Sequence, residues 1–123
     1  MNNKLAPQII EHVSKIFKAL SEPIRIRILQ ELAEEKSVSE LCADINTSQP
    51  NLSKHLKILF ELKLLSRRQE GNMVYYSITD PMVDKLCDLV CRGIQQKIDS
   101  EIRNLTSTRA ALQNNKRAFR RVS

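Results

Sequence analysis

Apolar residues recur every three or four positions through the first half of the chain, a spacing that predicts a series of amphipathic helices. Two of these helices begin near Pro23 and Pro50, as expected because the first turn of a helix tolerates proline. Thr47 or Ser48 is a suitable cap for the fourth helix. The predicted helices cover residues 7–20, 23–34, 37–44 and 48–62.

The pattern changes after Lys63, where β-forming residues flank Glu70-Gly71-Asn72. This arrangement predicts a two-stranded hairpin over residues 64–78, with glycine in the turn where a positive φ is expected. Asp80-Pro81 then ends the hairpin and opens a last helix. Helices joined by a short turn and followed by a hairpin form a winged helix. The predicted fold class is therefore mainly α with a small β-hairpin, a winged helix-turn-helix.

The apolar pattern of the last helix continues from Met82 to Leu105, about 25 residues. At 1.5 Å per residue such a helix is roughly 38 Å long, which is more than one small core covers. We therefore expect a homodimer that is held together through its first and last helices. Residues 1–105 are predicted to form the winged helix-turn-helix and dimerisation domain, and the basic residues 106–123 a partly disordered tail.

The composition of the chain indicates its net charge and the compartment in which we expect it. The chain has 123 residues, enough for one domain, and its net charge of +6 favours a polyanionic partner. No apolar run is long enough for a signal peptide or a membrane span, so we expect a soluble, cytoplasmic protein with no membrane partner. Its three cysteines, an odd number, favour reduced thiols over a disulfide framework.

The helix predicted over 48–62 has one apolar and one polar face. The apolar face, expected in the core, carries Leu52, Leu56, Leu59 and Phe60. The polar side carries Ser48, Gln49, Asn51, Ser53, Lys54 and Lys57. Such a helix suits the major groove of DNA, because Gln and Asn pair with adenine edges, Lys with guanine, and a serine at the helix start with a phosphate. The competing interpretation is a solvated face without a ligand.

Arg67 and Arg68 lie on the first strand of the predicted hairpin, where we expect them to contact the backbone or the minor groove of double-stranded DNA. Two arginines on a strand are also common on plain surfaces. His12 and His55 lie on helix flanks, and each is expected to be half-buried and hydrogen-bonded rather than a ligand. The sequence contains no phosphate-binding loop, nucleophile elbow or histidine pair at metal spacing, so an enzyme is not expected.

Cys87 and Cys91 are four residues apart, so their sulfurs share one face of the last helix. Two thiolates in this arrangement suit a thiophilic ion such as As(III), and they are also open to oxidation. Because cysteine is a small hydrophobic residue, packing is a third interpretation. All three remain open for this pair. Cys42 occupies an apolar position of the third helix, where packing is expected.

Three segments together resemble the ArsR–SmtB family of bacterial winged-helix repressors, and the resemblance covers roughly residues 13–98. They are FKALSEPIRIRIL at 17–29, VSELCADINTSQPNLSKHLKIL at 38–59 and LLSRRQEGNMVYYSITDP at 64–81. The resemblance implies a homodimeric repressor of a nearby operon that is released when an effector binds. A dimer is expected to bind a pseudo-palindromic operator. The family's DNA-binding positions carry over to Ser48, Gln49, Asn51, Ser53, Lys54, Arg67 and Arg68.

The family's two best-known metal sites do not carry over intact. Its arsenic, lead and cadmium sensors often have paired cysteines at the start of the third helix, but no second cysteine lies two residues after Cys42. Its zinc sensors use carboxylates and histidines of the last helix. Asp80 matches the first of these ligands, whereas Met82, Gly93 and Gln96 stand where others would be.

Cysteines within the last helix occur in family members that sense arsenite or sulfur-based oxidants. This resemblance makes Cys87 and Cys91 the predicted effector site, and Cys42 or a cysteine of the partner subunit would complete a three-thiolate site for As(III). The alternatives are a constitutive repressor with no thiol-based sensing, and a winged helix that serves as a protein-interaction adaptor.

Overall fold

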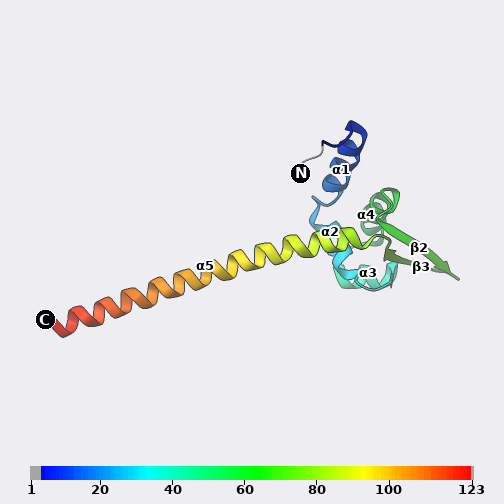
Figure 1. Cartoon of the computed structure of the whole chain (residues 1–123). Helices are drawn as coiled ribbons and strands as arrows, with labels where there is room; N and C mark the ends of the chain where they lie inside the picture. Colours follow the sequence, from blue (N-terminus) through cyan, green and yellow to red (C-terminus); the bar gives the residue numbers. More distant parts are fainter. Residues whose placement is uncertain (1–3, 123) are drawn as a thin grey trace. The chain divides into compact units, whose positions relative to one another are not determined.

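The computed structural model describes the backbone of residues 4–122 and the side chains of residues 4–115. Figure 1 labels the helices and the two longer strands, β2 and β3, along this part of the chain. The helices and strands are α1 Pro7–Ala19, α2 Pro23–Glu31, β1 Lys36–Ser37, α3 Val38–Ile45, α4 Gln49–Glu61, β2 Leu65–Glu70, β3 Met73–Ile78 and α5 Pro81–Val122. The chain divides into two compact units, a first that ends at Lys85 and a second that begins at Leu86.

The helices begin where the local sequence favours a start. All four prolines lie in first turns, where the helix does not need their missing N–H: Pro7, Pro23, Pro50 and Pro81. At α3, Ser37 Oγ accepts a hydrogen bond from Glu40 N at 3.1 Å, and Ser37 N donates to Glu40 Oε1 at 3.3 Å, which together form a capping box. At α4, Ser48 Oγ accepts from Asn51 N at 3.3 Å. The predicted starts of these helices are confirmed.

The predicted hairpin is confirmed as part of a larger sheet. β2 and β3 pair antiparallel from Leu65↔Ile78 to Glu70↔Met73, and Gly71 in the turn has the expected positive φ, 60°. The short strand β1 adds to the other side of β3, so the order is β1-β3-β2. The hydrophobic pattern does not predict β1, because two residues are too few to show an alternating period.

The core of the first unit forms where α2, α3, α4 and the sheet contact one another. Its most deeply buried apolar side chains are Ile28, Leu29, Leu41, Leu52, Leu56, Leu59 and Val83. Three of the four core positions predicted on α4 are therefore confirmed. The fourth, Phe60, is 41% exposed, so that prediction is wrong. It lies roughly 80° around the helix from Leu52, at the edge of the buried stripe.

Helices α1 and α5 each carry apolar side chains that remain exposed. On α1 they are Ile9, Ile10, Val13 and Phe17. On α5 they are Met82, Leu89, Val90, Ile94, Ile98, Ile102, Leu105 and Leu112. None of the helices has a stretch, within the described residues, that is apolar and long enough to cross a membrane.

Helix α5 continues beyond Leu105 to Val122, so the predicted end of the last helix is wrong. Large apolar residues are sparser after Leu105 than before it, but this basic segment is rich in Ala and Arg, which are good helix formers. Ser123 and the side chains of residues 116–122 lie outside the described residues. The division into a domain over 1–105 and a tail over 106–123 stays a prediction.

Candidate nucleic-acid interface

Helix α4 presents its polar residues to solvent as the sequence predicts. The exposed residues of this face are Ser48, Gln49, Asn51, Ser53, Lys54 and Lys57. The Ser48 hydroxyl holds the first turn through its bond to Asn51 N, and Asn51 Nδ2 donates to Thr47 Oγ1 at 3.0 Å. Lys57 Nζ lies 3.9 Å from Glu61 Oε1 in an exposed pair. The structure thus brings the predicted α4 residues together at and after one helix N-terminus.

The turn between α3 and α4 depends on a residue that the sequence analysis did not single out. Asn46 ends α3 in the left-handed conformation, with φ 59° and ψ 54°, and its N–H donates to Cys42 O at 2.9 Å. Asparagine tolerates this conformation better than most residues, which is the signal that identifies such a helix end. Asn46 therefore helps to set the direction in which α4 leaves the turn.

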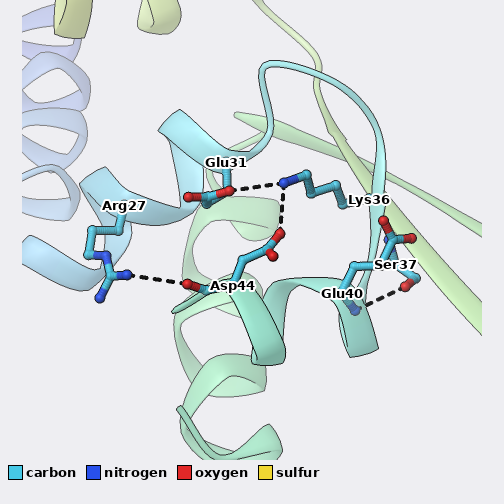
Figure 2. A network of polar contacts seen from close by, with 6 residues as sticks. All are labelled: Arg27, Glu31, Lys36, Ser37, Glu40 and Asp44. Atoms are coloured by element: carbon cyan, nitrogen blue, oxygen red, sulfur yellow. Dashed lines mark hydrogen bonds and ion pairs between the residues drawn. The ribbon is translucent and has the colours of Figure 1, made fainter. Parts of the chain in front are cut away.

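A polar network ties α3 to α2 and β1 (Figure 2). Lys36 Nζ lies 2.9 Å from Glu31 Oε2 and 2.7 Å from Asp44 Oδ2, and hydrogen bonds with these carboxylates raise the pKa of Lys36. Arg27 donates to the carbonyls of Ile45 at 3.3 Å and Asp44 at 3.4 Å, which lie at the end of α3 and have no partner within the helix. Because α3 contacts α4, a network that holds α3 in place also helps to hold α4 in place.

The two predicted wing arginines have different surroundings. Arg68 Nη2 lies 2.7 Å from Glu35 Oε1, and Arg68 Nη1 lies 2.6 Å from Glu70 Oε2. The hydrogen bond to Arg68 lowers the pKa of Glu35, and the two carboxylates raise the pKa of Arg68. The Arg68 guanidinium also lies over the ring of Tyr75. Arg67 is exposed and projects from the opposite face of β2, because side chains alternate along a strand.

The two histidines differ from each other. His55 is buried and accepts a hydrogen bond from Arg25, so the expectation of a hydrogen-bonded histidine is confirmed, with deeper burial than expected. His12 is exposed, and the expectation of half-burial is wrong in its case. The reason is that α1 is largely exposed along its length, with Ala19 as its buried residue.

The thiols fall in both units. Cys42 is half-buried in α3 of the first unit, as expected of a packing residue. In the second unit, Cys87 is half-buried and Cys91 is exposed. Their spacing within α5 puts both sulfurs on one helical face. Across the described residues, no group of three or more His, Cys, Asp or Glu side chains is arranged to hold a metal ion.

Comparison with known proteins agrees with this geometry. A helix-turn-helix domain model matches residues 20–68, from just before α2 into β2. The arsenical resistance operon repressor of Escherichia coli strain K12 is 34% identical over 96 residues, which cover 74% of this chain and 82% of that protein.

Two solved structures extend the similarity to the fold. The antimony-specific transcriptional repressor AntR superimposes with a TM-score of 0.72 at 25% identity, covering 80% of this chain and 92% of that one. A homodimeric winged helix-turn-helix DNA-binding domain from Mycobacterium bovis, a possible ArsR-family regulator, gives a TM-score of 0.69 at 26% identity and covers 80% of this chain and 94% of that one. The chain therefore belongs to the ArsR–SmtB family of winged-helix transcriptional repressors, which are DNA-binding regulators and not enzymes.

Proposed function

We propose that this chain represses transcription by binding a pseudo-palindromic operator as a homodimer, and that an effector bound at its thiols releases it from DNA. The observation that carries the DNA-binding part is the exposed polar face of α4, whose opposite face is buried and whose N-terminus is capped. The major groove of B-DNA is wide enough to admit such a helix.

Three side chains of α4 suit base edges in the major groove. Gln49 and Asn51 in the first turn read adenine, and Lys54 in the next turn reads guanine. Ser48 and the N–H groups of the first turn bind a phosphate, because a helix N-terminus attracts anions. These positions give α4 both a sequence-reading part and an anchoring part.

The remaining contacts are to the DNA backbone and carry no sequence information. Ser53 and Lys57 approach it from α4, and the exposed pair between Lys57 and Glu61 is weak enough to exchange for a phosphate. Arg67 approaches it from the wing. We assign the wing's backbone contact to Arg67 and not to Arg68, because Arg68 would have to leave two carboxylates.

A second copy of this chain is the partner that suits the exposed apolar side chains of α1 and α5. A stripe of this length is unfavourable in water, and pairing about a two-fold axis covers it equally in both copies. The related Mycobacterium bovis domain is homodimeric. A two-fold axis would also relate two copies of α4, so the operator is expected to contain two related half-sites.

The proposed effector site is the pair Cys87 and Cys91 on α5. Thiophilic ions prefer thiolate ligands, and the related proteins include an arsenical resistance repressor and an antimony-specific repressor. Two sulfurs provide two of the three thiolates of an As(III) site, so Cys42 or a cysteine of the second copy has to provide the third. Arsenite is the first effector to test, followed by a thiol oxidant or a persulfide donor acting on the same sulfurs.

Selection from a random-sequence duplex library, followed by titration of the enriched duplex, tests the DNA-binding part of this proposal. We expect enrichment of two related half-sites and a preference of about a thousandfold or more over unrelated DNA at moderate salt. If no sequence is enriched, the chain is not a sequence-specific repressor. Capture of a defined acidic protein by the same face of α4 would then support the adaptor role instead.

A further inference from the structure

The side chain of Arg25 connects three helices of the first unit. Arg25 lies in the first turn of α2, and its Nη1 donates to the carbonyl of Ala19, the last residue of α1, at 3.1 Å. Its Nε donates to Nδ1 of His55 in α4 at 3.2 Å. Both acceptor residues are buried, with exposed fractions of 3% for Ala19 and 8% for His55. One guanidinium thus satisfies buried acceptors on the two helices that flank it.

The hydrogen bond between Arg25 and His55, called the link below, connects to DNA binding through the position of His55 in α4. His55 follows Lys54 directly in α4, so any rotation or shift of the helix at His55 also displaces Lys54. Reading a base edge requires a side chain to be held within roughly 0.5 Å of its productive position. A buried acceptor left without a donor is unfavourable, so α4 favours the arrangement in which Arg25 reaches His55.

We propose that Arg25 is a positioning residue for DNA recognition, which holds the recognition helix α4 and the end of α1 in one arrangement through a neutral His55. The inference rests on the proposed reading of DNA by α4, but it assigns a role to two residues that do not touch the duplex. It also predicts that a change at the end of α1 is passed to α4 through one side chain.

The link requires His55 to be neutral, because Nδ1 accepts a hydrogen bond only while it carries no proton. Burial lowers the pKa of His55 first, and the nearby cations Arg25 and Lys54 lower it further, against an opposing contribution from Glu22. Arg25 also lines a surface hollow together with Lys15 and Lys18 of α1 and Glu61 of α4. Both signs of charge therefore surround this side of Arg25, with the positive charges on α1 and the negative charge on α4.

The direction of the pH effect follows from the lowered pKa. Below about pH 6.5, the ordinary value, the unfolded chain takes up a proton at this histidine more readily than the folded chain, so folding stability falls as the pH falls. A protonated His55 would also direct an N–H at the N–H of Arg25 and break the link. Specific DNA affinity is therefore expected to fall as the pH falls through the lowered pKa of His55.

Two substitutions distinguish a positioning role of the link from a role in general folding stability. In Arg25→Lys the charge remains, but a single ammonium cannot reproduce the two directed bonds of a guanidinium. In His55→Asn the amide oxygen lies close to the position of Nδ1 and accepts a hydrogen bond without titrating. His12→Asn is the matched control, since His12 is an exposed histidine of α1.

The experiment titrates a duplex selected by the wild-type chain, and an unrelated duplex, at pH 7.5 and at a series of lower pH values. Circular dichroism melts set the lowest pH at which every chain is still folded. We expect Arg25→Lys to lose about tenfold in specific affinity at pH 7.5, equivalent to about 1.4 kcal/mol, with its binding to unrelated DNA unchanged. We expect His55→Asn to bind like wild type at pH 7.5 and to lose the additional weakening that the wild type shows at the lower end of the pH series, which His12→Asn retains.

Several outcomes would overturn the proposal. An Arg25→Lys chain that matches wild type on the selected duplex shows that the link does not position α4, and so does a His55→Asn chain with the wild-type pH profile. If Arg25→Lys does not fold, the pH profile of His55→Asn decides alone. If the wild-type chain selects no duplex, the proposed function fails and the positioning role fails with it. A long-range 1H–15N spectrum that finds His55 protonated at Nδ1 at pH 7.5 would refute the link independently of DNA.

Discussion

The guanidinium carbon of Arg68 lies 4.4 Å from the ring centre of Tyr75, its cross-strand neighbour in the β2–β3 register. The same guanidinium pairs with Glu35, which precedes β1, and with Glu70 at the end of β2. Arg68 therefore braces the wing, whereas the adjacent Arg67 is exposed on the other face of the strand. Two neighbouring arginines of the same strand are expected to respond differently to substitution.

Arg67→Ala is expected to weaken binding to all DNA sequences by a similar factor and to reduce the slope of log affinity against log salt by about one unit. Arg68→Ala is expected to leave that slope unchanged and to increase amide hydrogen exchange in β1, β2 and β3, because it removes the brace. Titrations at three salt concentrations measure the slopes. An equal loss of slope in the two variants would show that Arg68 leaves its carboxylates to bind DNA.

Gln49→Ala and Lys54→Ala are each expected to cost about 1–3 kcal/mol of binding free energy on the selected duplex and to relax the preference at one base pair. Lys57→Ala is the matched control on the same helix, since a backbone contact changes affinity without changing base preference. The measurement is a titration of duplexes that carry single base-pair changes in one half-site. Unchanged base preference in both variants would show that Gln49 and Lys54 do not contact base edges.

Ser37→Ala is expected to lower the free energy of unfolding by about 1 kcal/mol, because it removes the capping box at α3 and leaves the Glu40 N–H without its acceptor. Ser39→Ala, an exposed position in the same helix, is the control and should change stability little. Urea unfolding at one fixed protein concentration measures both variants. Equal stabilities would show that the cap contributes nothing.

The sequence predicted those features of the fold that local chemistry determines. Prolines, capping serines and helical periodicity locate the starts of α1 to α4 because each signal acts within a few residues. Strand β1 has no such signal, since Lys36 and Ser37 become a strand only by pairing with Tyr76 and Tyr75. The end of α5 was missed for the converse reason: after Leu105 large apolar residues become sparse, while helix propensity continues.

The candidate site likewise has a part that local sequence predicts and a part that only the fold reveals. The residues that face outward from α4 follow from its helical period, and the structure exposes all of those predicted. The link between Arg25 and His55 spans 30 positions of sequence, and the pair of Arg68 with Glu35 spans 33. No spacing rule connects residues so far apart, so only the folded chain reveals which charges are already paired.

Ile98→Asp is expected to shift the chain from dimer to monomer and to reduce specific DNA affinity, because it places a charge in the exposed apolar stripe of α5. Gln96→Asp is the control, since it adds the same charge on the opposite face of the helix. Sedimentation at micromolar concentration measures the assembly. A wild-type chain that sediments as a monomer would contradict the proposed dimer. An Ile98→Asp chain that still sediments as a dimer would show that the interface does not include Ile98.

The double variant Cys87→Ser, Cys91→Ser is expected to bind the selected duplex like wild type and to resist release by the effector. In the proposed function, an ion held by these two sulfurs on one face of α5 would release the chain from DNA, and without the sulfurs it would have no binding site. A hundredfold loss of DNA affinity requires about 2.7 kcal/mol of coupling, which lies within the usual range for allosteric proteins.

The measurement is one DNA titration repeated with arsenite, cadmium, zinc and a persulfide donor on the wild type and the double variant, with Cys42→Ser as a third chain. If arsenite releases the wild type and Cys42→Ser but not the double variant, the third thiolate comes from the second copy, because Cys42 is then dispensable. If Cys42→Ser also resists release, Cys42 is a ligand. A double variant that is released as readily as wild type would show that Cys87 and Cys91 only pack. If no agent releases the wild type, the thiols do not sense these effectors and a constitutive repressor remains.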